Sequence, residues 1–234
     1  MKPTRLLGTL MFVLLILGMV TSIARAQKGK PKPPPTISDP AIAYSYPRAK
    51  QFDLMVMSAD GSNPTPVVSE SLTDNTAPDW SPDGTSLVFN RLERKTGQGK
   101  ICTKNLGSTV PLSCADRATN SRPAWSPIKF GVEPNKMYKI AFTSMVLKED
   151  GGRDSELFLA DYDGTNFFPS TQLTKTDDIN EGDVDWSPTG DRLAVGTYDG
   201  ARSDIKIYQI DCTASPCTAY ELSNLIQVTG SPLE

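Results

Sequence analysis

The tripeptide Trp-Ser-Pro occurs three times in this 234-residue chain, and its three copies contain all of the tryptophans. The copies begin at Trp80, Trp125 and Trp186, so the first two are 45 residues apart. A motif that recurs at such an interval indicates an array of structural repeats, each a supersecondary unit stacked on its neighbours. The repeat constrains the architecture strongly and says little about a ligand.

A strand, a turn and a second strand are expected around the first copy. Pro78-Asp79-Trp80 is predicted to be a strand that ends in the turn Ser81-Pro82-Asp83-Gly84. Proline suits the second position of such a turn, and glycine accepts a positive φ at its end. The aliphatic run Leu87–Phe89 then predicts the next strand.

The other two copies have the same surroundings. Their matching strands are Pro123–Trp125, Ile140–Phe142 and Leu157–Leu159, then Val184–Trp186, Leu193–Val195 and Ile205–Tyr208. An earlier unit begins at Ile42 and lacks a tryptophan strand. The sequence therefore predicts an all-β fold of about four blades of four antiparallel strands, the first without its inner strand. The longer second interval is expected to reflect loop insertions at 129–136 and 146–154.

The unit Pro-x-Trp-Ser-Pro-Asp-Gly, followed by an aliphatic strand and an Asp-Gly hairpin, resembles the WD40-like (PD40) repeats of TolB-type β-propellers. Residues 78–89 match nearly throughout, 185–190 match with threonine for aspartate, and 125–127 match only the first three positions. The resemblance covers 41–234. It implies a propeller without the α/β domain that precedes the propeller in TolB. Six or seven blades are usual in this family, so we expect an incomplete ring.

Within these repeats the tryptophans are interpreted as packing residues that face the neighbouring blade. The prolines and glycines of the motif are interpreted as turn residues. The predicted structural positions are Trp80, Trp125, Trp186, Pro82, Pro127, Pro188, Gly84 and Gly190.

The amino-terminal segment has the pattern of a secretory signal peptide. Lys2 and Arg5 precede the apolar run 6–20, and Ala24-Arg25-Ala26 is a small-x-small cleavage site. We expect residues 1–26 to be removed; the alternative is an uncleaved anchor helix. Residues 27–40 are rich in proline and lysine and predict an extended linker, with the propeller from 41 to 234.

Four cysteines in an exported chain are expected to form disulfides. Three connectivities are open, and free thiols in outer strands are the alternative. We predict the local pairs Cys102–Cys114 and Cys212–Cys217, since both flank turn-like sequence. No metal site is expected, because the two pairs lie about 100 residues apart and the chain has no histidine.

The absence of histidine argues against an enzyme. It excludes a Ser-His-Asp or Cys-His nucleophile and histidine-bound metals. A hydrolase domain with a Gly-x-Ser-x-Gly motif, as in peptidases with a similar propeller, is also absent from the sequence. We assign no catalytic residue and no cofactor. Without the three basic residues of the signal segment, 21 basic and 27 acidic residues give a net charge of −6, which disfavours nucleic acid.

The densest acidic stretch precedes the third tryptophan strand, so it is expected at one mouth of the propeller channel. The predicted binding residues are Asp177, Asp178, Asn180 and Glu181; the alternative is a solvated loop. The leading hypothesis is a periplasmic or secreted scaffold that binds a protein partner in the cell envelope, with no stable membrane insertion after signal cleavage. The alternatives are a carbohydrate-binding or lyase-like propeller that binds a glycan, and a truncated fragment of a larger propeller.

Overall fold

The computed structural model describes residues 41–118, 122–149, 151–213 and 217–221. The chain divides into two units, Met1–Pro33 and Pro34–Glu234, and every described residue belongs to the second. The predicted signal peptide (1–26) and linker (27–40) lie outside the described residues. No helix among the described residues combines the length and apolar character of a membrane span.

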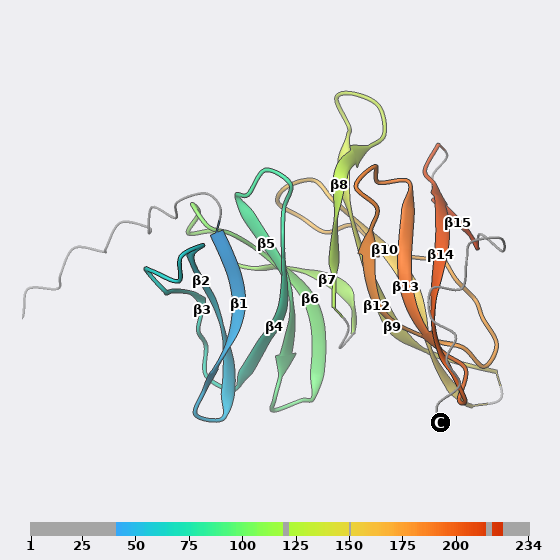
Figure 1. Cartoon of the computed structure of the whole chain (residues 1–234), viewed down its shortest axis with the longest axis horizontal. Helices are drawn as coiled ribbons and strands as arrows, with labels where there is room; N and C mark the ends of the chain where they lie inside the picture. Colours follow the sequence, from blue (N-terminus) through green and yellow to red (C-terminus); the bar gives the residue numbers. More distant parts are fainter. Residues whose placement is uncertain (1–40, 119–121, 150, 214–216, 222–234) are drawn as a thin grey trace, which may run out of the picture. The chain divides into compact units, whose positions relative to one another are not determined.

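All regular elements of the described chain are strands, and they form four antiparallel sheets in which strands that follow one another pair (Figure 1). The first sheet has three strands and the second has four. They are β1 (Ala41–Arg48), β2 (Gln51–Ser58) and β3 (Thr65–Val68), then β4 (Thr73–Trp80), β5 (Ser86–Glu93), β6 (Gln98–Asn105) and β7 (Ser113–Ala118).

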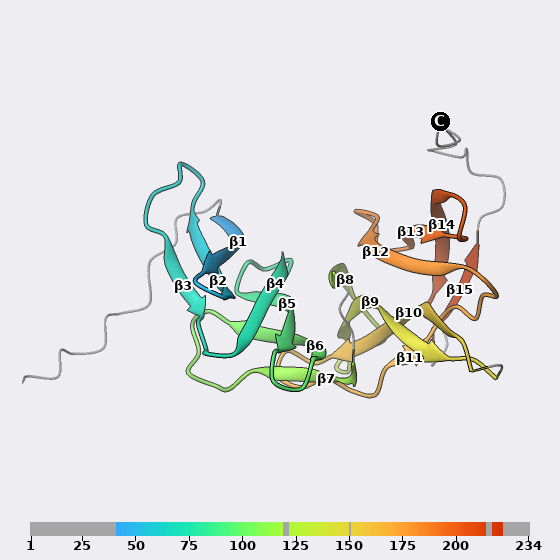
Figure 2. The ribbon, with the colours of Figure 1, turned by 90° about the horizontal axis from the view of Figure 1, so that it is seen from below.

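The third and fourth sheets also have four strands each, visible side by side in Figure 2. They are β8 (Ala124–Phe130), β9 (Met137–Leu147), β10 (Arg153–Tyr162) and β11 (Thr171–Gln172), then β12 (Asn180–Trp186), β13 (Arg192–Tyr198), β14 (Ser203–Asp211) and β15 (Thr218–Glu221). The three-stranded first sheet and the three tryptophan-containing sheets agree with the blades expected from the repeat.

Three separate hydrophobic cores lie between successive sheets. One joins Leu54 and Val56 of β2 to Leu87 and Phe89 of β5. The next joins the second sheet to the third, and the last joins the third to the fourth. Burial of apolar area between neighbouring sheets, with no core shared by all four, is the packing of a propeller.

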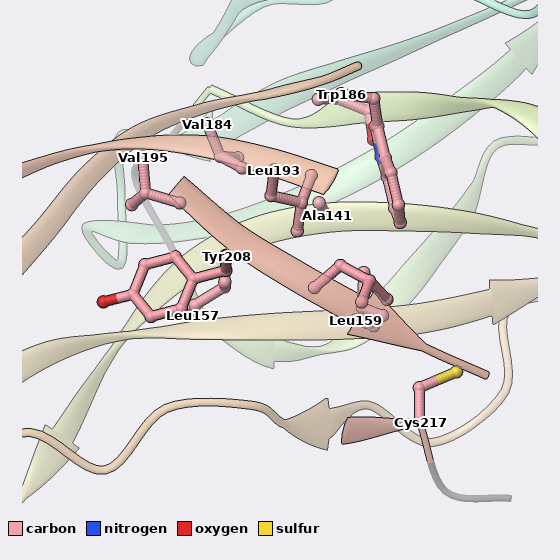
Figure 3. Packing of buried hydrophobic residues seen from close by; sticks show 11 residues of the cluster. Ala141, Leu157, Leu159, Val184, Trp186, Leu193, Val195, Tyr208 and Cys217 are labelled. Carbon is pink, nitrogen blue, oxygen red and sulfur yellow. The ribbon is translucent and has the colours of Figure 1, made fainter. Parts of the chain in front are cut away.

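Each tryptophan packs on the sheet that precedes its own. Trp125 is 5 % exposed in a core with Val88 and Ile101, and Trp80 contacts the core around Leu54. Figure 3 shows Trp186 beside Ala141 and Leu159 of the third sheet. The prediction that these side chains face the neighbouring blade agrees with this packing.

The insertions in the second interval lengthen two hairpins. Lys129 pairs with Tyr138 beyond the tryptophan, and Phe130 pairs with Met137. Val146 pairs with Asp154 in the same way. The chain therefore continues in β8 through Pro127 and Ile128, where the other two copies of the motif turn. The ends of both insertions extend the strands, and residues 131–136 and the described residues between Leu147 and Arg153 form the connecting loops, as expected from the sequence.

The turns of the first and third motifs have the same geometry. The amide of Gly84 donates to the Ser81 carbonyl at 2.8 Å, and that of Gly190 donates to the Ser187 carbonyl at 2.9 Å. Both glycines have a positive φ, 66° and 76°. Their surroundings differ, because a Cβ at Gly190 would lie 2.8 Å from the Ile128 Cγ1 of the neighbouring sheet, while one at Gly84 would meet nothing within 4 Å.

Alanine at the two turn glycines is expected to have unequal effects. Gly84→Ala should lower the free energy of unfolding by about 1–2 kcal/mol, the cost of a left-handed backbone in an L-residue. Gly190→Ala should cost about 1 kcal/mol more, because its Cβ displaces Ile128. Urea unfolding followed by circular dichroism measures both. Adding Ile128→Ala to Gly190→Ala should remove the difference, and equal losses in the two single variants would contradict the contact.

Two disulfides are present. Cys102 and Cys114, a registered pair of β6 and β7, are bonded, and Cys212 is bonded to Cys217. These are the local pairs expected from the sequence, and the described residues contain no free cysteine. Two disulfides fit an exported protein, because disulfides persist in oxidising compartments.

Candidate functional site

A groove of about 930 Å³ lies along the tryptophan-containing inner strands. Its walls come from all four sheets: from β1, from β4 and β5, from Pro123 and Ala124 at the start of β8, and from β12, β13 and β14. Its charged and amide side chains are Asp79, Asn90, Arg122, Asp183 and Asp185.

Bulges in the inner strands shape this groove. The register of β4 shifts between Thr76 and Asp79, and that of β12 shifts between Glu181 and Val184. In the first bulge Ala77 has a φ of 52°, a strained value for a residue with a Cβ. A bulge redirects the side chains that follow it. The aspartate before the tryptophan therefore lines the groove in both strands.

Asp79 links the second sheet to the third. Its two carboxylate oxygens accept hydrogen bonds from the amides of Trp80, at 2.9 Å, and Trp125, at 2.7 Å. Burial raises the pKa of the Asp79 carboxyl above its ordinary value. The hydrogen bonds from the two amides lower this pKa, and the negative charge of Asp185 raises it further, but burial has the largest effect. The two aspartates are therefore close enough to repel each other across the groove.

Asp185 occupies the matching position of the fourth sheet. One of its oxygens accepts from the Trp186 amide at 2.8 Å. The third sheet has Ala124 at this position, and the Ala124 carbonyl instead accepts from the Trp186 indole at 3.2 Å. The residue before the tryptophan thus sets the charge of the groove in each blade.

Two further side chains complete the polar lining. Asn90 of β5 is 7 % exposed, and its side-chain oxygen has no hydrogen-bond partner within the described chain. Arg122 forms a solvent-exposed ion pair with Asp183 at 3.5 Å. Three aspartates and one arginine give the groove a formal charge of −2. The groove is rich in acceptors and is suited to a ligand that donates hydrogen bonds or carries positive charge.

The four residues predicted to bind a ligand lie outside the groove, in different surroundings. Asp177 and Asp178 are exposed in a turn, and Asp178 pairs with Lys148 at 3.4 Å. The Asn180 side chain accepts from the Ser155 amide at 3.2 Å, and Glu181 is only 2 % exposed. None of the four lines the groove. The sequence does contain a pattern that marks the groove: an aspartate precedes two of the three tryptophans. In the sequence analysis these aspartates were assigned to the strand and given no binding role.

Glu181 instead forms a buried carboxyl pair with Glu156 of β10. Glu156 accepts from the Thr174 hydroxyl at 2.7 Å and the Thr176 amide at 2.9 Å, and the Thr176 hydroxyl donates to Glu181 at 3.2 Å. Burial, and then the charge of Glu156, raise the pKa of Glu181 to about 7. This pair belongs to the joint between the third and fourth sheets.

A metal centre has no support in the described residues, where no group of three histidine, cysteine or acidic side chains is arranged to hold an ion. Both oxygens of Asp79 are already bonded to amides, so that carboxylate is anchored in one orientation.

No protein-family model and no curated protein sequence matches the chain. Solved structures do match. A protein described as a candidate TolB from Agrobacterium tumefaciens is 17 % identical with a TM-score of 0.55, over 78 % of this chain and 61 % of that one. A structure from a study of two prolyl endopeptidases is 15 % identical with a TM-score of 0.51, over 78 % and 27 %. Prolyl oligopeptidase B from Galerina marginata is 10 % identical with a TM-score of 0.51, over 79 % and 29 %.

These likenesses, all at low identity, establish the fold. The chain is an all-β protein whose antiparallel sheets fit an incomplete β-propeller. Among propellers its fold is TolB-like. The chain spans 61 % of the TolB candidate and less than a third of each peptidase.

Proposed function

We propose that this protein is a non-enzymatic propeller scaffold outside the cytoplasm, where it binds a protein partner of the cell envelope through the inner-strand groove. The observation that carries the proposal is the groove itself. It is about 930 Å³ in volume, draws its walls from all four sheets and presents more acceptors than donors. Small-molecule sites are lined mainly by apolar and aromatic side chains, and this groove has a charged lining without an aromatic ring among the described residues, which favours a partner segment.

The location of the protein is inferred from two independent features. The amino-terminal pattern is that of a secretory signal peptide, and two disulfides are typical of proteins in oxidising compartments. The repeats are proposed to be of the WD40-like PD40 type. The matching geometry of the Gly84 and Gly190 turns supports this assignment.

A binding role agrees better with the groove chemistry than catalysis does. General acid–base work near neutral pH uses histidine most often, and the chain has none. The most buried groove carboxylate, Asp79, is held by two amides that link neighbouring sheets. The glycan alternative has less support, because no aromatic ring among the described residues lines the groove for a sugar to stack on.

Affinity capture with the mature protein tests the proposal. Wild type should retain a specific partner from a cell-envelope extract of the source organism. Asp183→Trp, which fills the groove at an exposed position, should lose it, while Asp177→Trp should retain it as a matched control. Capture that is equal in both variants would contradict groove binding. Turnover of a glycan by the purified protein would contradict the scaffold role.

A further inference from the structure

We propose that the groove recognises a lysine or arginine side chain of its partner, inserted between Asp79, Asp185 and Asn90. This inference rests on the proposed function, since it specifies which chemistry the partner presents to the same groove. It names a basic segment of a protein as the ligand class.

The first argument is unbalanced charge. Asp79 and Asp185 come from different sheets, and their negative charges repel each other across the groove. The charge of Asp185 contributes to the raised pKa of Asp79. Arg122 does not relieve this, because it pairs with Asp183 in solvent, where such pairs contribute little. A cationic side chain between the two carboxylates would remove the repulsion and gain charge-assisted hydrogen bonds.

The second argument is that two other largely buried aspartates, Asp53 and Asp74, have counter-ions from this chain. Within the first sheet Arg48 pairs with the buried Asp53 at 2.8 Å, and within the second Arg94 pairs with Asp74 at 2.8 Å. No cation other than Arg122 lines the described groove. The groove carboxylates are thus left for a cation that comes from outside the chain.

The third argument is the unsatisfied side-chain oxygen of Asn90. This residue is more than nine-tenths buried and lines the groove, yet its oxygen accepts no hydrogen bond from the described residues. A buried acceptor without a donor costs about 1–3 kcal/mol. Lysine and arginine side chains carry donors and no acceptors, so one of their N–H groups satisfies this oxygen and no further acceptor is brought into the groove.

A selection from a phage-displayed random dodecapeptide library on the mature protein tests the inference. Selected peptides should share a lysine or arginine at one recurrent position, and glutamine there should weaken binding about tenfold or more. The selection is performed in EDTA. Peptides without a basic preference, or no enriched peptide, would overturn the inference. Peptides that are enriched only when the selection is repeated with Ca²⁺ in place of EDTA would also overturn it, because a metal ion would then be the groove cation.

Matched variants then locate the basic side chain. Asp185→Asn keeps an acceptor for the Trp186 amide and should weaken the basic peptides about tenfold, while Asp185→Lys should abolish their binding. Asp177→Asn removes the same charge at an exposed turn and should leave binding unchanged. Equal weakening by Asp185→Asn and Asp177→Asn would show attraction to overall charge and sink the proposal. If neutral peptides are selected that bind the wild type and fail to bind Asp183→Trp, that result would refute the preference for a basic side chain and would still support binding in the groove.

Discussion

Replacing Trp125 with alanine is expected to lower the free energy of unfolding by about 3–5 kcal/mol, the usual cost of removing a buried tryptophan. Trp125 is 5 % exposed and lies in the core between the second and third sheets. The edges of its ring system meet Tyr138 and Tyr162, with centroids 5.7 and 5.4 Å apart. Alanine at this position would leave a cavity between the two sheets, and the melting temperature should fall by about 10 °C.

Two other variants make that expectation specific. Trp80→Ala should cost roughly half as much, because Trp80 is only partly buried against its core. Trp125→Phe should cost less than Trp125→Ala, since it keeps an aromatic ring and removes an indole N–H that has no partner in the described chain. Chemical denaturation measured by tryptophan fluorescence and circular dichroism gives the three values. Equal losses for Trp80→Ala and Trp125→Ala would contradict the described burial.

Glu181→Gln is expected to stabilise the protein at pH 8 and to have little effect at pH 4.5. The pKa of Glu181 rises from 4.5 to about 7 because the carboxyl is buried beside Glu156. Between these two values the folded state retains a proton that the unfolded state has lost. The contribution of this group to stability is therefore complete below pH 4.5, declines as the pH rises towards 7, and is absent above it.

The size of this effect follows from the shift. A difference of this magnitude corresponds to about 3 kcal/mol between the two ends of the pH range. Glutamine, which carries no charge, should recover about 2–3 kcal/mol at pH 8, or roughly 5–10 °C in melting temperature. Thermal unfolding at pH 4.5, 6 and 8 provides the measurement, and Asp178→Asn at the exposed turn is the control. A gain from Glu181→Gln that does not vary with pH would rule out a buried, protonated carboxyl.

The sheets could be predicted because their signals are local. A strand before Trp80, the Ser81–Gly84 turn and the run 87–89 follow one another within a dozen residues, and each is read from short-range chemistry. The three-stranded first sheet followed from the missing tryptophan strand. The inserted residues at 129–136 were expected in a turn. Residues 131–136 do form the loop, and only Lys129 and Phe130 lengthen β8, because they pair with Tyr138 and Met137 across the hairpin.

The groove could not be predicted because it depends on register. In a regular strand Glu181 and Asp185 would point to the same face, since side chains repeat every two residues. The bulge after Glu181 places the first in the joint beside Glu156 and the second in the groove. A sequence pattern shows the density of acidic residues in 177–185. It does not show which of them a bulge turns inwards.

The bulged inner strands also bear on how such a protein can change its specificity. Asp79, Ala124 and Asp185 hold one structural position in three successive repeats, and all three line the groove. A single codon at Ala124 or Asp185 changes the groove by one unit of charge, whereas a change at Asp79 also removes the hydrogen bonds that link the second sheet to the third. Recognition and folding are thus encoded by separate adjacent residues in the third and fourth sheets, while in the second sheet Asp79 serves both.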